Sequence, residues 1–130
     1  MRASDYILQR LAAEGIDTAF VVYGGAISEL MDAFTRQDRI RYVVCQHEQA
    51  CAFAAEGYAQ AKGVPGLAIA TSGPGGHNMV TGIANCFYNS VPAIFITGQV
   101  STKFMSHPGS GLRQLGFQEW PAAEVMRPIT

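Results

Sequence analysis

The hydrophobic residues of this chain fall into two patterns that alternate along it. Continuous apolar runs such as AFVVY, LAIAT and AIFIT are typical of strands buried on both faces. The stretches between them place apolar residues three and four positions apart, which indicates amphipathic helices. The pattern predicts strands over 19–23, 42–45, 67–71 and 93–97, and helices over 5–13, through 30–34, over 48–62 and from the end of a 72–76 loop to about 89.

Residues with strong end preferences mark the limits of two of these helices. Ser4 stands where an N-cap is expected for the helix over 5–13, and Gly15 supplies its stop. Gly63 directly follows the alanine-rich stretch 48–62 and is expected to close it. These signals support the predicted alternation of strand and helix.

Strands that alternate with helices predict an α/β fold. Because the strands are continuous apolar runs, we expect a three-layer αβα sandwich whose mainly parallel sheet is covered on both faces. A chain of 130 residues, 48% of them hydrophobic, suits one domain with a real core, so we expect a single domain over 1–130. Ligands gather at the carboxyl ends of parallel strands, and the loops at 24–25, 46–48, 72–76 and 98–99 are expected to converge there.

Composition argues against several classes of partner. Nine Lys and Arg residues balance ten Asp and Glu residues and are scattered, which argues against nucleic acid or an anionic membrane as the main partner. Nowhere do about 18 apolar residues run together. Cys45, Cys51 and Cys86 have no CxxC spacing, so neither a disulfide framework nor a zinc finger is predicted. With charges in place of a signal-peptide pattern at the start, a cytoplasmic location is expected.

The segment from 100 to 130 has no clear hydrophobic period. Residues 100–116 contain Gly, Ser and Pro and predict a long functional loop, in which His107 is expected to be an exposed surface histidine. Residues 117–130 contain no evident final strand or helix cap. We therefore expect the chain to end early, as a piece of a larger protein.

Glu48 is the acidic residue with the most informative position, at a junction of strand and helix on the expected ligand edge. A first-turn glutamate favoured by the helix dipole is the simpler interpretation. The small residues that follow it let the helix pack closely and hold the carboxylate in a partly dry place. A zinc-protease motif is excluded because Cys51 stands where HExxH requires histidine, and no metal site is predicted. Cys51 is expected to be a core residue and His47 a structural one.

The loop over 71–78 is glycine-rich, which suggests that its backbone approaches a ligand. It is not a nucleotide fingerprint, because Asn78 stands where GxGxxG requires glycine and no Gly-Lys-Ser/Thr follows. Pro74 also removes one amide donor from any phosphate cradle. Taken alone, the loop is compatible with a tight turn or with a ligand contact.

Read together, four motifs resemble one family. They are F-x-x-x-G-G-A-I at 20–27, H-E-Q at 47–49 with A-E-G-Y-A at 55–59, T-S-G-P-G at 71–75, and P-A-I-F-I-T-G-Q-V at 92–100. In order and spacing they resemble the amino-terminal, pyrimidine-binding domain of the thiamine-diphosphate-dependent acetolactate synthase, pyruvate oxidase and pyruvate decarboxylase superfamily. The resemblance covers nearly the whole chain.

The resemblance implies a role for each matching residue. Glu48 would hydrogen-bond the pyrimidine N1′ of thiamine diphosphate and favour the imino form whose N4′ removes the thiazolium C2 proton. Gln118, in a segment that resembles the family's F-Q-E, would be a further active-site residue. Cofactor contacts would come from the backbone around Gly24 and from neighbouring positions: Tyr23, Gly25, Thr71, Pro74 and Asn78.

Two departures from the family pattern concern substrate preference. Tyr23 replaces the usual proline before the Gly-Gly pair, and the interval from Gln99 to Gln118 is longer than is typical of acetolactate synthases. The family's diphosphate-binding domain, which holds Mg²⁺, has no counterpart here. The resemblance therefore implies a cofactor shared with the diphosphate domain of a partner chain in a homo-oligomer, with FAD as a further possibility in a longer parent.

Two functions follow as hypotheses. The first is part of an enzyme that decarboxylates pyruvate or a related 2-keto acid and transfers the product, inactive as an isolated chain. The second is a catalytically inactive truncated product or assembly subunit that keeps the fold and the dimer surface. A generic nucleotide-binding domain is disfavoured because the fingerprints fail.

Overall fold

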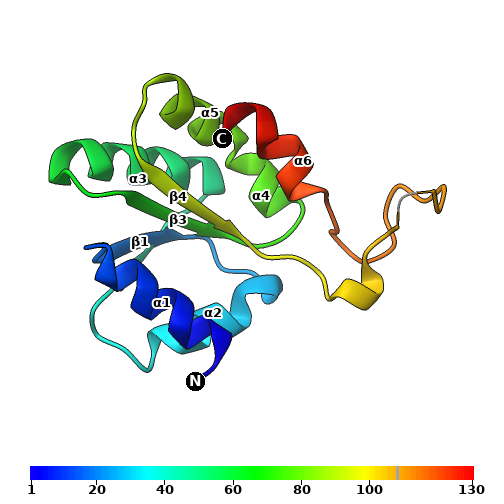
Figure 1. Cartoon of the computed structure of the whole chain (residues 1–130), viewed down its shortest axis with the longest axis horizontal. Coiled ribbons are helices and arrows are strands. Elements are labelled where there is room, and N and C mark those ends of the chain that lie inside the picture. The colour runs from blue at the N-terminus through cyan, green and yellow to red at the C-terminus, as the bar shows by residue number, and fades with distance from the viewer. Residues whose placement is uncertain (108) are drawn as a thin grey trace.

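The computed structural model describes residues 1–107 and 109–130, which form alternating helices and strands (Figure 1). In chain order the elements are α1 (Ala3–Ala13), β1 (Thr18–Val21), the 3₁₀ turn η1 (Gly25–Ile27), α2 (Ser28–Phe34), β2 (Arg41–Val44), α3 (Glu48–Lys62), β3 (Gly66–Ala70), α4 (Pro74–Asn78), α5 (Val80–Tyr88), β4 (Ala93–Thr97), η2 (Thr102–Phe104), α6 (Ala122–Met126) and η3 (Arg127–Ile129).

The described strands form one parallel sheet in the order β2-β1-β3-β4. Helices α1 and α2 cover one face of this sheet, and α3, α4, α5 and α6 lie on the other (Figure 1). Each face has its own hydrophobic cluster, one centred on Leu8, Ile16 and Leu67 and the other on Cys51, Ala68 and Met79. The predicted three-layer α/β architecture with a parallel sheet is confirmed.

Small residues let α3 lie very close to the sheet and to α5. A Cβ atom on Gly66 of β3 would stand 2.0 Å from the carbonyl oxygen of Ala55, and one on Gly82 of α5 would stand 2.4 Å from the Cβ of Ala52. Real Cβ atoms never approach so closely, so glycine is required at both positions. The backbone of α3 is therefore fixed on two sides, and this fixes the position of its first residue.

β2 forms one edge of the sheet and is the least covered strand. Its side chains are exposed along its whole length, including Tyr42, Val43 and Val44. In contrast, every residue of β3, at the centre of the sheet, is buried. The expectation that the strands are covered on both faces thus holds for the centre of the sheet and not for this edge.

Two local predictions were wrong. Ser4 lies inside the first turn of α1 and does not cap it; the helix begins at Ala3, and the Asp5 carboxylate accepts from the backbone N–H of Arg2 at 3.4 Å. The predicted loop 72–76 is half helical, because Pro74 starts α4, a position where its fixed φ suits a helix. The terminal segment, in which the sequence shows no final strand or helix cap, forms the short helices α6 and η3 without a side-chain cap, and Met126 packs it on the core.

Other local predictions were confirmed. Helix α3 spans 48–62, and Gly63 closes it in the left-handed conformation with φ 74°. No helix in the described part of the chain is long and apolar enough to cross a membrane.

Candidate functional site

The loops that follow the strands meet at the carboxyl edge of the sheet, as predicted. The loop after β1 lies against the loop after β3, since a Cβ atom on Gly24 would stand 2.4 Å from the Cβ of Thr71. The loop after β4 lies against η1, since a Cβ on Gly98 would stand 2.6 Å from the Cβ of Ala26. This edge therefore brings together backbone segments that are far apart in the sequence.

Glu48 is the first residue of α3 and lies half-buried at this edge. His47 caps the helix, because its Nδ1 accepts from the backbone N–H of Gln49 at 3.1 Å, and this confirms the structural role expected for His47. The Nδ2 group of Asn78, the last residue of α4, donates to Glu48 Oε2 at 2.9 Å. Within the described residues, Glu48 Oε1 accepts no hydrogen bond.

Two glycines enclose Thr71 next to that carboxylate. A Cβ on Gly75 would stand 2.8 Å from Thr71 Cγ2 and 3.5 Å from Glu48 Oε1. On the other side Gly24 lies even closer to Thr71, and the Thr71 hydroxyl accepts from the backbone N–H of Ala26 at 3.3 Å. Thr71 is thus held in one position, with the space beside Glu48 bordered by backbone.

The remaining predicted cofactor residues lie at more open positions. The Tyr23 side chain is 62% exposed, and the space around Gly25 is open. Pro74 is exposed as the first residue of α4. Of the residues proposed from the sequence, the structure therefore brings Glu48 and Asn78 into direct contact, with Gly24 and Thr71 adjoining, and places Tyr23, Gly25 and Pro74 on the surface.

Gln118 reaches the same region from the far end of the chain. It has a left-handed backbone conformation with φ 60°, which is uncommon for a residue with a side chain. A Cβ on Gly73, in the loop that carries Thr71, would stand 2.7 Å from the carbonyl oxygen of Gln118. Gln118 therefore packs directly on the glycine-rich loop.

Two neighbours of Gln118 were missed by sequence reasoning. Trp120 is buried beneath α4, where a Cβ on Gly76 would stand 2.2 Å from its ring, and His77 packs edge-on against it with ring centroids 4.3 Å apart. The Glu119 carboxylate accepts hydrogen bonds from the preceding loop, chiefly from the backbone of Leu115, and these lower its pKa to about 2. A tryptophan in an irregular segment was the available signal for such packing.

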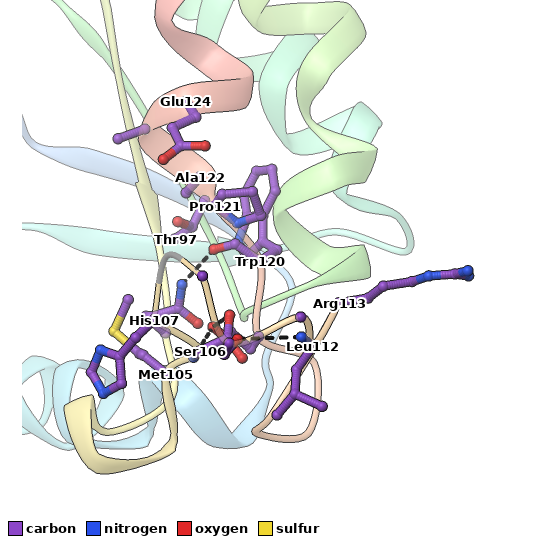
Figure 2. A pocket seen from close by; sticks show the side chains of 16 residues that line it. Thr97, Met105, Ser106, His107, Leu112, Arg113, Trp120, Pro121, Ala122 and Glu124 are labelled. Carbon is purple, nitrogen blue, oxygen red and sulfur yellow. Dashed lines mark hydrogen bonds between the residues drawn. The ribbon is translucent and has the colours of Figure 1, made fainter.

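The long loop and α6 enclose a cavity of about 760 Å³ (Figure 2). His107 is exposed at its border, as expected, and the Arg113 side chain extends away from it (Figure 2). The segment from 100 to 116 is thus a structured loop that contains η2, apart from residue 108, which lies outside the described residues.

The cysteines are poor candidates for chemistry. Cys51 is fully buried, and burial is the main cause that raises the pKa of its thiol far above the usual range. Burial likewise raises the pKa of Cys86 to about 11. The prediction that Cys51 is a core residue is confirmed. Among the described residues there is no group of three or more His, Cys, Asp or Glu side chains that could hold a metal ion.

Comparison with known proteins agrees with this arrangement. Residues 1–125 match the family model of the thiamine pyrophosphate enzyme N-terminal TPP binding domain. The chain is 45% identical over 127 residues to acetolactate synthase 2, chloroplastic, of Brassica napus, which covers 98% of this chain and 19% of that protein. It is 40% identical over 130 residues to a probable acetolactate synthase large subunit of Methanocaldococcus jannaschii, covering all of this chain and 21% of that one.

A bacterial relative extends the comparison. The acetolactate synthase isozyme 2 large subunit of Escherichia coli K12 is 43% identical over 105 residues, which cover 81% of this chain and 19% of that protein. The chain thus spans about a fifth of the length of the curated relatives it matches. The parallel sheet, the strand-end position of Glu48 and these matches lead to one conclusion: the chain belongs to the family of N-terminal TPP-binding domains of thiamine pyrophosphate enzymes, in its acetolactate synthase-like branch.

Proposed function

We propose that this chain forms the pyrimidine-binding side of a thiamine diphosphate site in an enzyme that decarboxylates pyruvate or a related 2-keto acid and joins the product to an acceptor. The observation that carries the proposal is the Glu48 carboxylate. One of its oxygens is bound by Asn78, while the other faces the backbone-lined space beside Gly75. This arrangement supplies a positioned acceptor at the ligand edge of the sheet.

The residues present fit the pyrimidine half of the cofactor. A flat heterocycle needs a close approach of the backbone and a few convergent polar groups. The close approach comes from the segments that contain Gly24, Thr71 and Gly75. Glu48 and Asn78 provide the polar groups. Thiamine diphosphate, when bound, supplies an electron sink for the carbanion that decarboxylation of a 2-keto acid leaves.

The proposed roles of the protein groups come from the family resemblance, and the contacts around Glu48 support them. Glu48 holds a proton at the pyrimidine N1′, and Asn78 orients the carboxylate by donating to its other oxygen. The backbone at Gly24 accepts from the 4′-amino group. Gln118 contacts the substrate from the turn that packs on Gly73. Thr71 and Pro74 line the ring, with Tyr23 and Gly25 at the outer margin.

We propose that a partner chain completes the site by supplying a diphosphate-binding domain with its Mg²⁺. Exposed aromatic side chains on the helices of this face support this: Phe53 lies in the second turn of α3, and the paired Phe87 and Tyr88 lie at the end of α5. A shallow hollow bordered by His47, Ala50 and Phe53 lies on the same side of α3. A homo-oligomer in which these faces meet is the proposed assembly, and a bound FAD in a longer parent is a proposal from family resemblance alone.

A reducing compartment, the cytoplasm, is proposed because the three cysteines carry free thiols. Several relatives are described as chloroplastic. The free thiols therefore support a reducing environment more directly than they support the cytoplasm itself. Cell fractionation followed by thiol labelling tests it, and a cysteine found oxidised in the native protein would contradict it.

The test of function is a reconstitution. The intact protein is mixed with thiamine diphosphate, Mg²⁺ and pyruvate, and release of carbon dioxide is measured with and without an added diphosphate-domain partner. Release that requires the partner supports the proposal. Absence of release in both mixtures contradicts it and favours the second hypothesis, a non-catalytic assembly subunit.

Glu48→Gln tests the role of the Glu48 carboxylate directly. Loss of acid–base function is expected to slow exchange of the cofactor C2 proton by at least about 10²-fold, followed by NMR. Glu29→Gln is the matched control, because Glu29 also occupies the first turn of a helix, α2, and is exposed. Equal effects of the two substitutions would mean that Glu48 only interacts favourably with the helix dipole.

A further inference from the structure

The Glu119 carboxylate joins two parts of the long loop over 100–116. Its Oε1 accepts from the backbone N–H of Ser106 at 2.6 Å and from the Ser106 hydroxyl at 2.7 Å. Its Oε2 accepts from the backbone N–H of Leu115 at 2.8 Å and from that of Gly116 at 3.4 Å. Figure 2 labels Ser106 at the border of the pocket, where dashed lines mark its hydrogen bonds. One side chain therefore ties Ser106 to Leu115 and Gly116.

The same carboxylate reinforces the tight turn that contains Gln118. The backbone N–H of Glu119 donates to the carbonyl of Gly116 at 3.1 Å, which defines a four-residue turn over 116–119. Gln118 is the third residue of this turn and has a φ of 60°, where glycine is the usual occupant. Such a conformation persists only where the surroundings impose it. Here the Glu119 carboxylate accepts from the N–H groups of Leu115 and Gly116, which lead into the turn, and Gln118 itself packs on Gly73.

The position of this turn decides where Gln118 lies relative to the cofactor site. The carbonyl and Cβ of Gln118 pack on Gly73 so closely that a Cβ there would stand 2.7 and 2.8 Å from them. Gly73 belongs to the loop that holds Thr71 beside Glu48. Movement of the turn would therefore move the Gln118 side chain away from the region around Thr71.

We propose that Glu119 is a positioning residue for Gln118, whose carboxylate locks the 116–119 turn and thereby sets Gln118 at the substrate side of the cofactor site. This inference rests on the proposed function for the role of Gln118, although the lock itself does not. Since hydrogen bonds from Leu115 and Ser106 hold the pKa of Glu119 at about 2, the carboxylate is ionised at neutral pH and keeps all of its acceptor capacity.

Hydrogen exchange tests the lock. In Glu119→Gln one acceptor oxygen becomes an amide donor, so the amides of Ser106, Leu115 and Gly116 are expected to exchange about tenfold faster or more in the intact protein. Glu124→Gln is the control, because Glu124 borders the same cavity and its side chain makes no hydrogen bond within the described residues. Unchanged exchange of the three amides in Glu119→Gln would overturn the proposal whether or not the protein turns over a 2-keto acid.

A double-mutant cycle tests the link to Gln118. Gln118→Ala, Glu119→Gln and the double variant are compared by kcat and KM for pyruvate in the reconstituted enzyme. If Glu119 acts through Gln118, both single variants impair the same kinetic parameter, either kcat or KM. The double variant then has the same kcat and KM as Gln118→Ala. Additive losses would overturn the positioning role even if the loop loosens. If the reconstituted wild type is inactive, the proposed function is contradicted. The hydrogen-exchange rates then decide whether Glu119 holds the 116–119 turn.

Discussion

Asn78 Nδ2 donates to Glu48 Oε2 at 2.9 Å, and this bond joins the last residue of α4 to the first residue of α3. It leaves the second carboxylate oxygen for a ligand. A carboxylate fixed by one amide is oriented without being saturated, which is the state that a residue intended to bind a heterocyclic nitrogen requires.

Replacing Asn78 by alanine is expected to weaken thiamine diphosphate binding by about tenfold or more, because a hydrogen bond to a charged group contributes about 1.5–3 kcal/mol. Isothermal titration calorimetry of the reconstituted enzyme measures the effect. Asn85→Ala is a suitable control, since Asn85 donates to a different carboxylate, that of Glu56. An unaltered affinity in Asn78→Ala would show that the amide does not orient Glu48.

Gly75→Ala and Gly57→Ala form a matched pair of helical glycine substitutions. A Cβ at position 75 would stand 2.8 Å from Thr71 Cγ2, whereas a Cβ at position 57 has open space. We expect Gly57→Ala to stabilise the protein by about 0.5–1 kcal/mol. Crowding against Thr71 is expected to cost about 1–3 kcal/mol, so Gly75→Ala should not be stabilising.

Urea unfolding monitored by circular dichroism measures both free energies of unfolding. A Gly75→Ala variant that matched the stability gain of Gly57→Ala would mean that Thr71 can move aside. The tight packing argued for the site would then be wrong.

Glu56 is a buried carboxylate with amide partners on the neighbouring helix. Both of its oxygens lie 2.8 Å from Asn85 Nδ2, while Asn89 Nδ2 is more distant at 3.4 Å. Asn85→Ala leaves the carboxylate without its main donor and should lower the free energy of unfolding by about 1–2 kcal/mol. Asn89→Ala should cost less than half as much. Equal losses, measured by urea unfolding, would contradict this ranking.

Asp17 is expected to make stability depend on pH. The Tyr58 hydroxyl, and after it Lys62 and Thr18, donate hydrogen bonds that hold the pKa of Asp17 well below its usual range. Because the folded pKa lies below the unfolded value of about 3.9, the unfolded state binds protons first. The stabilisation is therefore fully present above about pH 5 and is lost as the pH falls below about 4 towards the folded pKa.

The comparison that isolates this effect uses Asp17→Asn. Wild type should be the more stable protein at pH 7, and the difference should shrink below pH 4. Asp38→Asn is the control, because the Asp38 side chain makes no hydrogen bond or ion pair within the described part of the chain. If the difference in free energy of unfolding between wild type and Asp17→Asn stays constant from pH 7 to pH 3, Asp17 does not cause the pH dependence.

The parts of the structure that depend on local signals could be predicted from the sequence. The limits of α3 follow from its alanine-rich composition and from Gly63, and the parallel sheet follows from continuous apolar strands. The convergence of Glu48 with the glycine-rich loop follows from parallel topology. Ser4 was misassigned because serine alone cannot specify an N-cap, and Asp5 reaches back to Arg2 instead.

The parts that depend on contacts distant in sequence could not be predicted. Trp120 packs under α4 only because Gly76 has no side chain, and nothing in the local sequence of either residue records the other. The local sequence around Glu119 does not indicate its hydrogen bonds with Ser106 and Leu115, because both donors lie in a loop that has no hydrophobic period. Helix α6 consists mostly of good helix formers, but at five residues it is too short to show a hydrophobic period or to be stable alone, and it forms because Met126 packs in the core beside Trp120.

The uncovered edge strand β2 has a practical consequence for handling the protein. Tyr42, Val43 and Val44 offer an apolar, unpaired strand edge, which is a template for pairing with other chains. The domain produced by itself at high concentration should therefore aggregate through this strand, and Val43→Lys, which places a charge on the exposed edge, should keep it dispersed.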